Sequence, residues 1–440
     1  DHDSAIKAAD DYRRRNPAEV APYNLLGQAY LAARDDDNAR EAFEQVLELA
    51  PGDPNANHAL ALLAEQTGDL AAARAYYQAV LQERKDYLPT LMRLSALEAK
   101  AGDEQAMVAG LNRAMEVHPE AVEPRLALSR YYLARGEVET AAGMFSDLGN
   151  AARLRPEVAQ LLAQAELQQN NYAAARFYLE GLVEAQPDAA QWHYQLALAH
   201  AGEGSGEKMR EELEATIRID GDFFPARVAL ARWFLLQQDL PRLEAQLVEL
   251  RRLAPENSDV MQLEGALASL KDDPDAALDK LQLAFEQAPS SASLLTLARQ
   301  QYAAGEKAAA KSLMQTWLDD HENDVATRTA LAQVLLMEEQ EDKAATEFRR
   351  VLETEPRNVV ALNNLAWILL EDDPAAALEF AERAAEAAPE SAQVLDTLAM
   401  ALLENQELAR ATRAITRAIA INPNVPTQHY HAARILVARG

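Results

Sequence analysis

The sequence predicts an all-α solenoid built from antiparallel helix pairs, and two repeating features of the chain support this. The first is a ladder of prolines at or near multiples of 34 residues, the length of a helix-turn-helix solenoid unit. The second is a set of small residues that recurs with the same period. The rungs of the ladder are Pro17, Pro51, Pro119, Pro187, Pro255, Pro289, Pro356, Pro389 and Pro423, with Lys85, Arg153, Gly221 and Glu322 where proline is missing.

Counting each unit from the third residue after a rung divides the chain into three parts. Residues 1–19 are expected to form the second helix of a truncated repeat. Residues 20–423 hold twelve tandem repeats, and residues 424–440 form the first helix of a truncated thirteenth. Half a repeat exposes an apolar face that a capping helix normally covers, so we expect the native polypeptide to continue in at least one direction.

The first helix of each unit is predicted from apolar residues at positions 4, 7 and 11, which share one face at about 3.6 residues per turn. In the first repeat these are Tyr23, Leu26 and Tyr30. Position 8 holds a small residue in every unit, which indicates that two helices pass closely there. The residues are Gly27, Ala61, Ser95, Ser129, Ala163, Ala197, Ala231, Gly265, Ala298, Ala332, Ala366, Ala399 and Ala433.

A turn and a second helix follow in each unit. Position 15 is often glycine, as at Gly68 and Gly102, and glycine readily takes the positive φ that ends a helix. Positions 20, 24 and 27 then share one face, as Ala39, Phe43 and Val46 do in the first repeat. The rung closes the second helix, because proline cannot continue the hydrogen-bond ladder.

Small residues at positions 8 and 20, aromatic or leucine residues at 4, 11 and 24, and proline at 32 resemble the tetratricopeptide repeat over essentially the whole chain. The resemblance implies a right-handed superhelix whose first helices line a concave groove, with positions 2, 5 and 9 pointing into it. It also implies that a protein or peptide partner binds there. The expected binding residues are Asn24, Gln28, Arg130, Gln164, Tyr194, Arg232, Arg299, Gln333, Asn363 and Trp367.

The groove arginines have two interpretations. Arg130, Arg232 and Arg299 present forked donors that hold a partner's carboxylate or carbonyl, or they pair with neighbouring acids. Relatives that clamp acidic peptide tails need further cations. At position 2 this chain instead has acidic residues such as Glu157 and Asp259, so the sequence does not favour recognition of acidic tails.

The composition excludes several classes of function. The chain has 42 basic and 70 acidic residues and a net charge of −28, which disfavours nucleic acid because phosphates are held mainly by lysine and arginine. With no cysteine, disulfides and thiolate chemistry are absent. No apolar run approaches the roughly 20 residues that span a bilayer, so we expect no membrane insertion by this segment.

We expect no catalytic residue, cofactor or metal site, and therefore a protein that is not an enzyme. His193 and His200 share a helical face, but they occupy packing positions 4 and 11. His429 and His431 are two residues apart and face different ways on a helix. Aspartates at the turns, such as Asp35-Asp36-Asp37, are expected to cap helices.

The carboxy-terminal repeats bear a narrower resemblance to bacterial tetratricopeptide lipoproteins of exopolysaccharide and PEP-CTERM sorting systems. The runs that carry it include Asn363-Asn364-Leu365-Ala366-Trp367 and Leu395-Asp396-Thr397-Leu398. It implies an interaction scaffold in exopolysaccharide export, and a periplasmic or outer-membrane-associated site rather than a cytoplasmic one. The alternative is a regulatory or targeting arm of a larger enzyme or secretion-channel protein.

Overall fold

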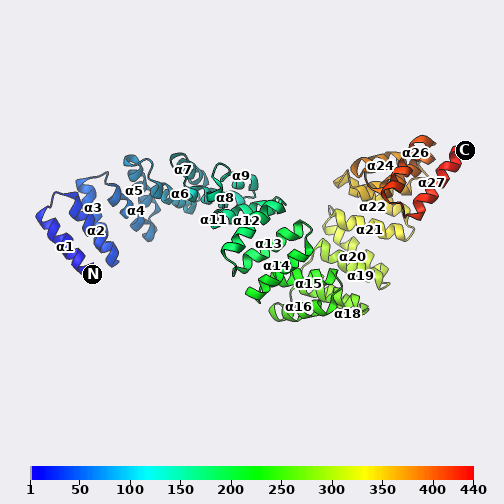
Figure 1. Cartoon of the computed structure of the whole chain (residues 1–440), viewed down its shortest axis with the longest axis horizontal. Coiled ribbons are helices and arrows are strands. Elements are labelled where there is room, and N and C mark those ends of the chain that lie inside the picture. The colour runs from blue at the N-terminus through cyan, green and yellow to red at the C-terminus, as the bar shows by residue number, and fades with distance from the viewer. Residues whose placement is uncertain (1) are drawn as a thin grey trace. The chain divides into compact units, whose positions relative to one another are not determined.

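The computed structural model describes residues 2–440, which form 27 helices and no strand. The chain divides into two compact units that meet between Phe223 and Phe224. In each unit the helices follow one another in chain order (Figure 1). The all-α solenoid of helix pairs predicted from the sequence is therefore confirmed.

The first unit contains α1 to α14. Their bounds are α1 His2–Arg15, α2 Val20–Ala33, α3 Asp36–Leu49, α4 Pro54–Thr67, α5 Leu70–Glu83, α6 Leu88–Ala101, α7 Glu104–Val117, α8 Val122–Ala134, α9 Val138–Gly143, α10 Asn150–Arg153, α11 Pro156–Gln168, α12 Tyr172–Ala185, α13 Ala190–Gly202 and α14 Gly206–Ile219.

The second unit contains α15 to α27. Their bounds are α15 Phe224–Leu236, α16 Leu240–Leu253, α17 Ser258–Leu270, α18 Pro274–Gln287, α19 Ser291–Ala303, α20 Lys307–Asp320, α21 Val325–Met337, α22 Glu341–Thr354, α23 Val359–Ile368, α24 Pro374–Ala387, α25 Ala392–Glu404, α26 Leu408–Ile421 and α27 Pro426–Arg439.

The small residues at position 8 lie where the two helices of a pair approach most closely. All of them are buried except Ala433 in α27. A Cβ atom added to Gly27 would lie 2.7 Å from the ring of Phe43, and one added to Gly265 would lie 2.7 Å from Leu281 Cγ. Position 8 is thus kept small chiefly by the large side chain at position 24 of the second helix.

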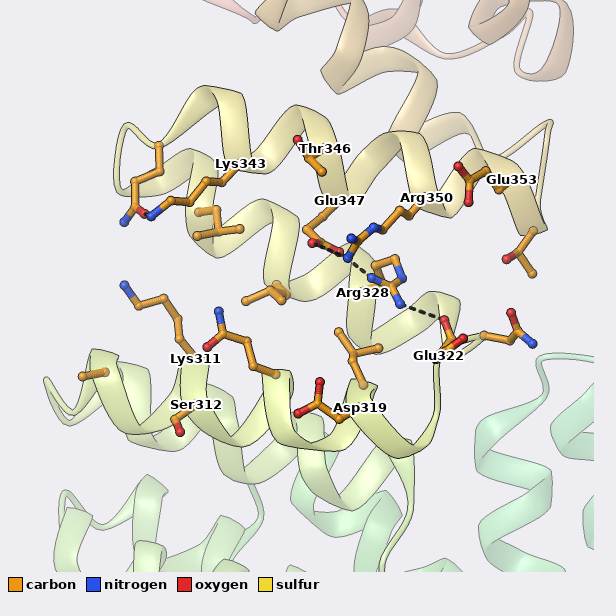
Figure 2. Close-up of a pocket in the computed structure, with 18 residues that line it drawn as sticks. Lys311, Ser312, Asp319, Glu322, Arg328, Lys343, Thr346, Glu347, Arg350 and Glu353 are labelled. Carbon is orange, nitrogen blue, oxygen red and sulfur yellow. Dashed lines mark hydrogen bonds and ion pairs between the residues drawn. The ribbon is translucent and has the colours of Figure 1, made fainter.

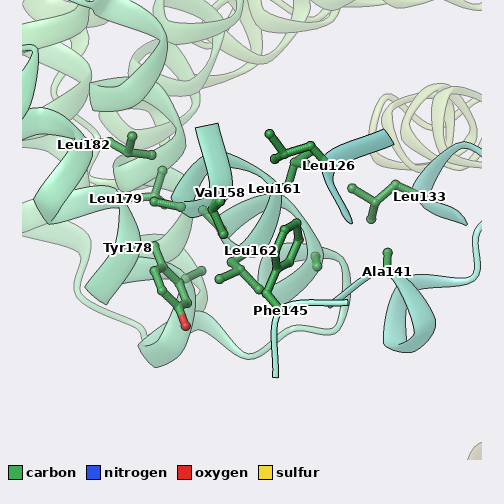
Figure 3. Close-up of a cluster of buried hydrophobic side chains, with 14 of the residues drawn as sticks. Leu126, Leu133, Ala141, Phe145, Val158, Leu161, Leu162, Tyr178, Leu179 and Leu182 are labelled. Atoms are coloured by element: carbon green, nitrogen blue, oxygen red, sulfur yellow. The ribbon is translucent and has the colours of Figure 1, made fainter. Parts of the chain in front are cut away.

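The second helix of the fourth repeat is interrupted, which the repeat pattern did not predict. α9 ends at Gly143, and the short α10 begins after Gly149, both glycines being poor helix formers. Phe145 and Leu148 nevertheless stay buried in the core shown in Figure 3. Arg125 stabilises the break, because its guanidinium donates to Met144 O at 2.6 Å and to Asp147 Oδ1 at 2.5 Å.

Candidate functional site

The first helices of neighbouring repeats lie against one another within each unit. Direct first-helix pairs are α8 with α11, α15 with α17, α19 with α21, α23 with α25 and α25 with α27. Among the described residues, no pair of second helices packs as closely. The first helices therefore form the tighter side of each unit, and the second helices form the more open side.

Many position 9 side chains of the first helices are exposed, although Met400 is buried. We call the exposed position 9 side chains of each unit its first-helix face. Its candidate binding residues are Gln28, Arg130, Gln164, Arg232, Arg299, Gln333 and Trp367, and every one is exposed. The indole of Trp367 is 44% exposed although tryptophan is a large apolar residue. These side chains are available to a partner without any rearrangement of the fold.

The candidate residues at position 5 lie deeper than the sequence suggested. Asn24 is partly buried and donates to Asp53 Oδ2 at 3.4 Å. Tyr194 is also partly buried, with its ring centroid 5.1 Å from that of Phe223. Asn363 is only 6% exposed, and its buried Oδ1 has no hydrogen-bond partner among residues 2–440. A buried amide oxygen without a partner is energetically unfavourable.

The three arginines of the first-helix face differ in their partners, so each interpretation holds for some of them. Arg232 donates to Asp259, position 2 of the next repeat, at 2.6 Å. Arg130 and Arg299 make no ion pair with any residue in the described part of the chain.

The residue at position 2 of the following repeat explains this difference. Glu157 is the counterpart for Arg130, but it pairs with Arg155 at 2.5 Å. The counterpart for Arg299 is Ala326, which has no charge. Arg130 and Arg299 are therefore the free guanidinium groups of the candidate set.

The candidate residues fall into two sets that belong to different units. The first unit contains Asn24, Gln28, Arg130, Gln164 and Tyr194, and the second contains Arg232, Arg299, Gln333, Asn363 and Trp367.

In the second unit, Trp367 lies next to a second aromatic ring that is itself held by a hydrogen bond. The Trp367 and His431 rings are 5.9 Å apart, and Asp396 accepts a hydrogen bond from His431 Nδ1 at 2.8 Å.

Position 4 has a structural role that the sequence analysis did not anticipate. Its polar side chains donate to the carbonyl oxygen of the rung six residues earlier and so satisfy a carbonyl near the end of the preceding helix. The pairs are Tyr23 with Pro17, Asn57 with Pro51, Arg125 with Pro119, His193 with Pro187, Arg328 with Glu322 and His429 with Pro423. The recurrence of polar-tipped residues six positions after a rung was the available signal.

Histidines and turn aspartates form contacts within the fold. His193 bonds to Glu212 Oε2 at 2.6 Å and to Pro187 O at 3.0 Å, and His200 is buried. Asp35 accepts from Asn38 N at the start of α3. Within the described residues, no group of three or more histidine or carboxylate ligands is placed to hold a metal ion.

Two titratable groups with shifted pKa values link neighbouring helices. Burial opposes ionisation of Glu264, but hydrogen bonds from Lys280 and Arg251 outweigh it, so the Glu264 pKa lies below its ordinary value. Burial, together with the 2.5 Å hydrogen bond to Glu65, raises the Tyr77 pKa. Each of these groups links neighbouring helices inside the packed layers, and neither lies on the first-helix face.

Comparisons with known proteins agree with the repeat and the fold. A model described as tetratricopeptide repeat matches residues 1–54, 25–87 and 161–222. The chain is 27% identical over 154 residues to Cellulose synthase operon protein C of Pseudomonas fluorescens (strain SBW25), a match covering 33% of this chain and 12% of that protein.

Comparison with solved structures shows a likeness in fold to one of them. Yeast Tom70 aligns at a TM-score of 0.51 and 15% identity over 96% of each chain, which shows a shared fold alone. The APC/C hetero-tetramer Cut9-Hcn1 aligns at a TM-score of 0.43 and 14% identity, over 94% of this chain and 96% of that one, too weakly to add to the comparison. Among residues 2–440, no helix combines the length and apolar character that crossing a membrane requires.

Proposed function

We propose that this chain is a non-enzymatic scaffold that holds a partner segment on its first-helix face. The proposal rests on its tetratricopeptide repeats, because proteins with this fold generally serve as protein-interaction scaffolds. The observation that carries this proposal is a pair of exposed groups on that face in the second unit. Arg299 is an unpaired exposed cation, and Trp367 is a large exposed ring.

These groups match the needs of a polypeptide ligand. A guanidinium binds a carboxylate or a main-chain carbonyl through its forked donors. An exposed indole packs against an apolar side chain or a cation. The first unit has a more polar first-helix face of its own, with Arg130, Gln28 and Gln164.

We place the scaffold in bacterial exopolysaccharide export or assembly. Two observations support this assignment. The first is the similarity to the relative named Cellulose synthase operon protein C. The second is the set of lipoprotein-like sequence runs near Asn363 and Leu395.

A second candidate function is that of a regulatory or targeting arm of a larger enzyme or secretion channel. The matched segment makes up only 12% of the curated relative, which is what a repeat arm of a much larger protein would show.

Affinity capture from a lysate of the source cell, followed by mass spectrometry, tests the proposal. The baits are the wild-type chain and a variant carrying Arg299→Glu and Trp367→Ala. Arg349→Glu is the matched control, because Arg349 is exposed on α22 and has no ion pair among the described residues.

We expect a partner that the wild type and the control retain and the double variant loses. Recovery of exopolysaccharide-export components supports the assigned process. Equal retention by all three baits would move the partner site away from the first-helix face.

A further inference from the structure

A cleft opens between the second helices α20 and α22, on the side of the second unit away from the first-helix face (Figure 2). Its volume is about 800 Å³, within the range of roughly 300–1,000 Å³ usual for ligand sites. The two helices form its walls. Leu331 and Leu335 of α21, together with Leu318 of α20, supply a narrow apolar floor.

The floor of the cleft is held in place by a buried ion-pair network. Arg328 is 8% exposed and donates to Glu347 Oε2 at 2.5 Å and to Glu322 O at 2.8 Å. Arg350 contacts the other oxygen of Glu347 at 3.1 Å. These groups satisfy one another, so the base of the cleft needs little reorganisation when a ligand enters.

The two ends of the cleft differ in charge. Lys311 and Lys343 lie at the end where α20 and α22 begin (Figure 2). Toward the other end, Glu322, Glu353 and Asp319 outnumber the one exposed cation, Arg350 (Figure 2). Lys311 pairs with Glu338, but Lys343 reaches only the neutral Gln340 amide at 2.9 Å. The carboxylates of Glu322 and Glu353 have no partner among the described residues.

The backbone dipoles of α20 and α22 strengthen this separation of charge. Both helices run from the lysine end to the carboxylate end (Figure 2). A helix carries partial positive charge at its N-terminus and partial negative charge at its C-terminus. The cleft is therefore positive at one end and negative at the other over the length of its walls, about 21 Å for helices of 14 residues.

We propose that this cleft binds an amphipathic helical segment of a partner protein, antiparallel to α20 and α22. Basic side chains in the first turn of the segment contact Glu322 and Glu353, and acidic side chains in its last turn contact Lys343. Its apolar stripe faces the narrow strip of Leu318, Leu331 and Leu335 at the base of the cleft. These leucines are already buried, so the charges at the two ends of the cleft dominate recognition of the segment. The antiparallel direction also places its dipole ends opposite those of the two wall helices.

Two synthetic peptides of 14 residues and identical composition test this proposal. Both carry one leucine stripe. The forward peptide has two lysines in its first turn and two glutamates in its last, and the reverse peptide has these charges exchanged. Fluorescence anisotropy with the full chain is expected to show about tenfold tighter binding of the forward peptide, the sum of several rim charge contacts. The difference should shrink in 0.5 M salt.

Charge reversal in the cleft is the decisive variant. The triple variant Glu322→Lys, Glu353→Lys and Lys343→Glu is expected to prefer the reverse peptide. The controls are Arg349→Glu, on α22 outside the cleft lining, and Glu386→Lys, which has the same place in α24 as Glu353 has in α22. Both should retain the wild-type preference, and circular dichroism verifies that every variant is folded.

The proposal is overturned if neither peptide binds at 1 mM, or if both bind equally well to the wild type. Equal effects of the cleft and control variants would overturn it too. Concentration-dependent self-association that only the triple variant loses would show that a second copy of this chain fills the cleft instead. Partner capture on the first-helix face does not involve Glu322, Glu353 or Lys343. A negative result for the cleft therefore leaves the proposed function untouched, and a negative capture result leaves the cleft proposal untouched.

Discussion

Replacing Gly27 by alanine tests the close packing of the helix pairs with a single methyl group. The added Cβ would lie 2.7 Å from Phe43 Cε1 and Cζ and 2.8 Å from Cε2, whereas carbon atoms in good contact are about 3.5–4.0 Å apart. Phe43 is 1% exposed and packs in a cluster with Ala39 and Val46. The ring has little room to move away, so the methyl group forces the helices or the ring to shift.

Two opposing effects decide how much Gly27→Ala changes the stability of this helix pair. Alanine in a helix interior is favoured over glycine by about 1 kcal/mol, and overpacking a filled core costs about 1–3 kcal/mol. The net expectation for Gly27→Ala is a loss of about 0–2 kcal/mol. Gly181 in α12 is the matched control, because an added Cβ there meets no atom within 4 Å. Gly181→Ala should therefore stabilise its helix by about 1 kcal/mol.

Hydrogen exchange under native conditions is the suitable assay. Repeats contact mainly their neighbours, so unfolding of the whole chain need not be two-state and one global free energy would mix many repeats. Peptide-resolved exchange isolates the amides of α2 and α3 from those of α12. Exchange should accelerate in the first set and slow in the second. If Gly27→Ala slows exchange as much as Gly181→Ala does, the steric reasoning for position 8 is wrong.

Four further predictions follow. Ala366→Leu places bulk at a fully buried position 8 and should destabilise α23 and α24 by about 1–3 kcal/mol; unchanged exchange there would refute the register. Arg125→Met removes charged donors from the Met144 and Pro119 carbonyls and should cost about 3 kcal/mol near α9, measured the same way. Because the folded pKa of Glu264 is lowered from 4.5, its stabilisation is present above about pH 4.5 and lost as pH falls through the folded value. In Glu264→Gln the local opening free energies of α17 and α18, from hydrogen exchange corrected for the intrinsic rate, should therefore depend less on pH below 4.5. Arg299→Glu should weaken partner capture more than Arg232→Glu, whose native side chain already pairs with Asp259.

The helix pairs could be predicted because their packing constraint is local and repeated. A small residue at position 8 and a large one at position 24 recur in most units, and Gly27 with Phe43 shows the contact directly. The interruption after Gly143 escaped prediction, because Phe145 and Leu148 keep the helical spacing and stay buried. Only the bonds from Arg125 to the freed Met144 carbonyl reveal how the irregular segment is held.

The sequence by itself determined the repeat and its register, since both follow from helical periodicity against a neighbour. The structure explains why Arg299 is free, because the next repeat has Ala326 at the position where Asp259 pairs with Arg232. Only the tertiary structure decided that Arg130 is free, because Arg155 competes for Glu157 in space. It alone also located the cleft between α20 and α22, because the spacing of second helices depends on how whole repeats stack rather than on any single residue.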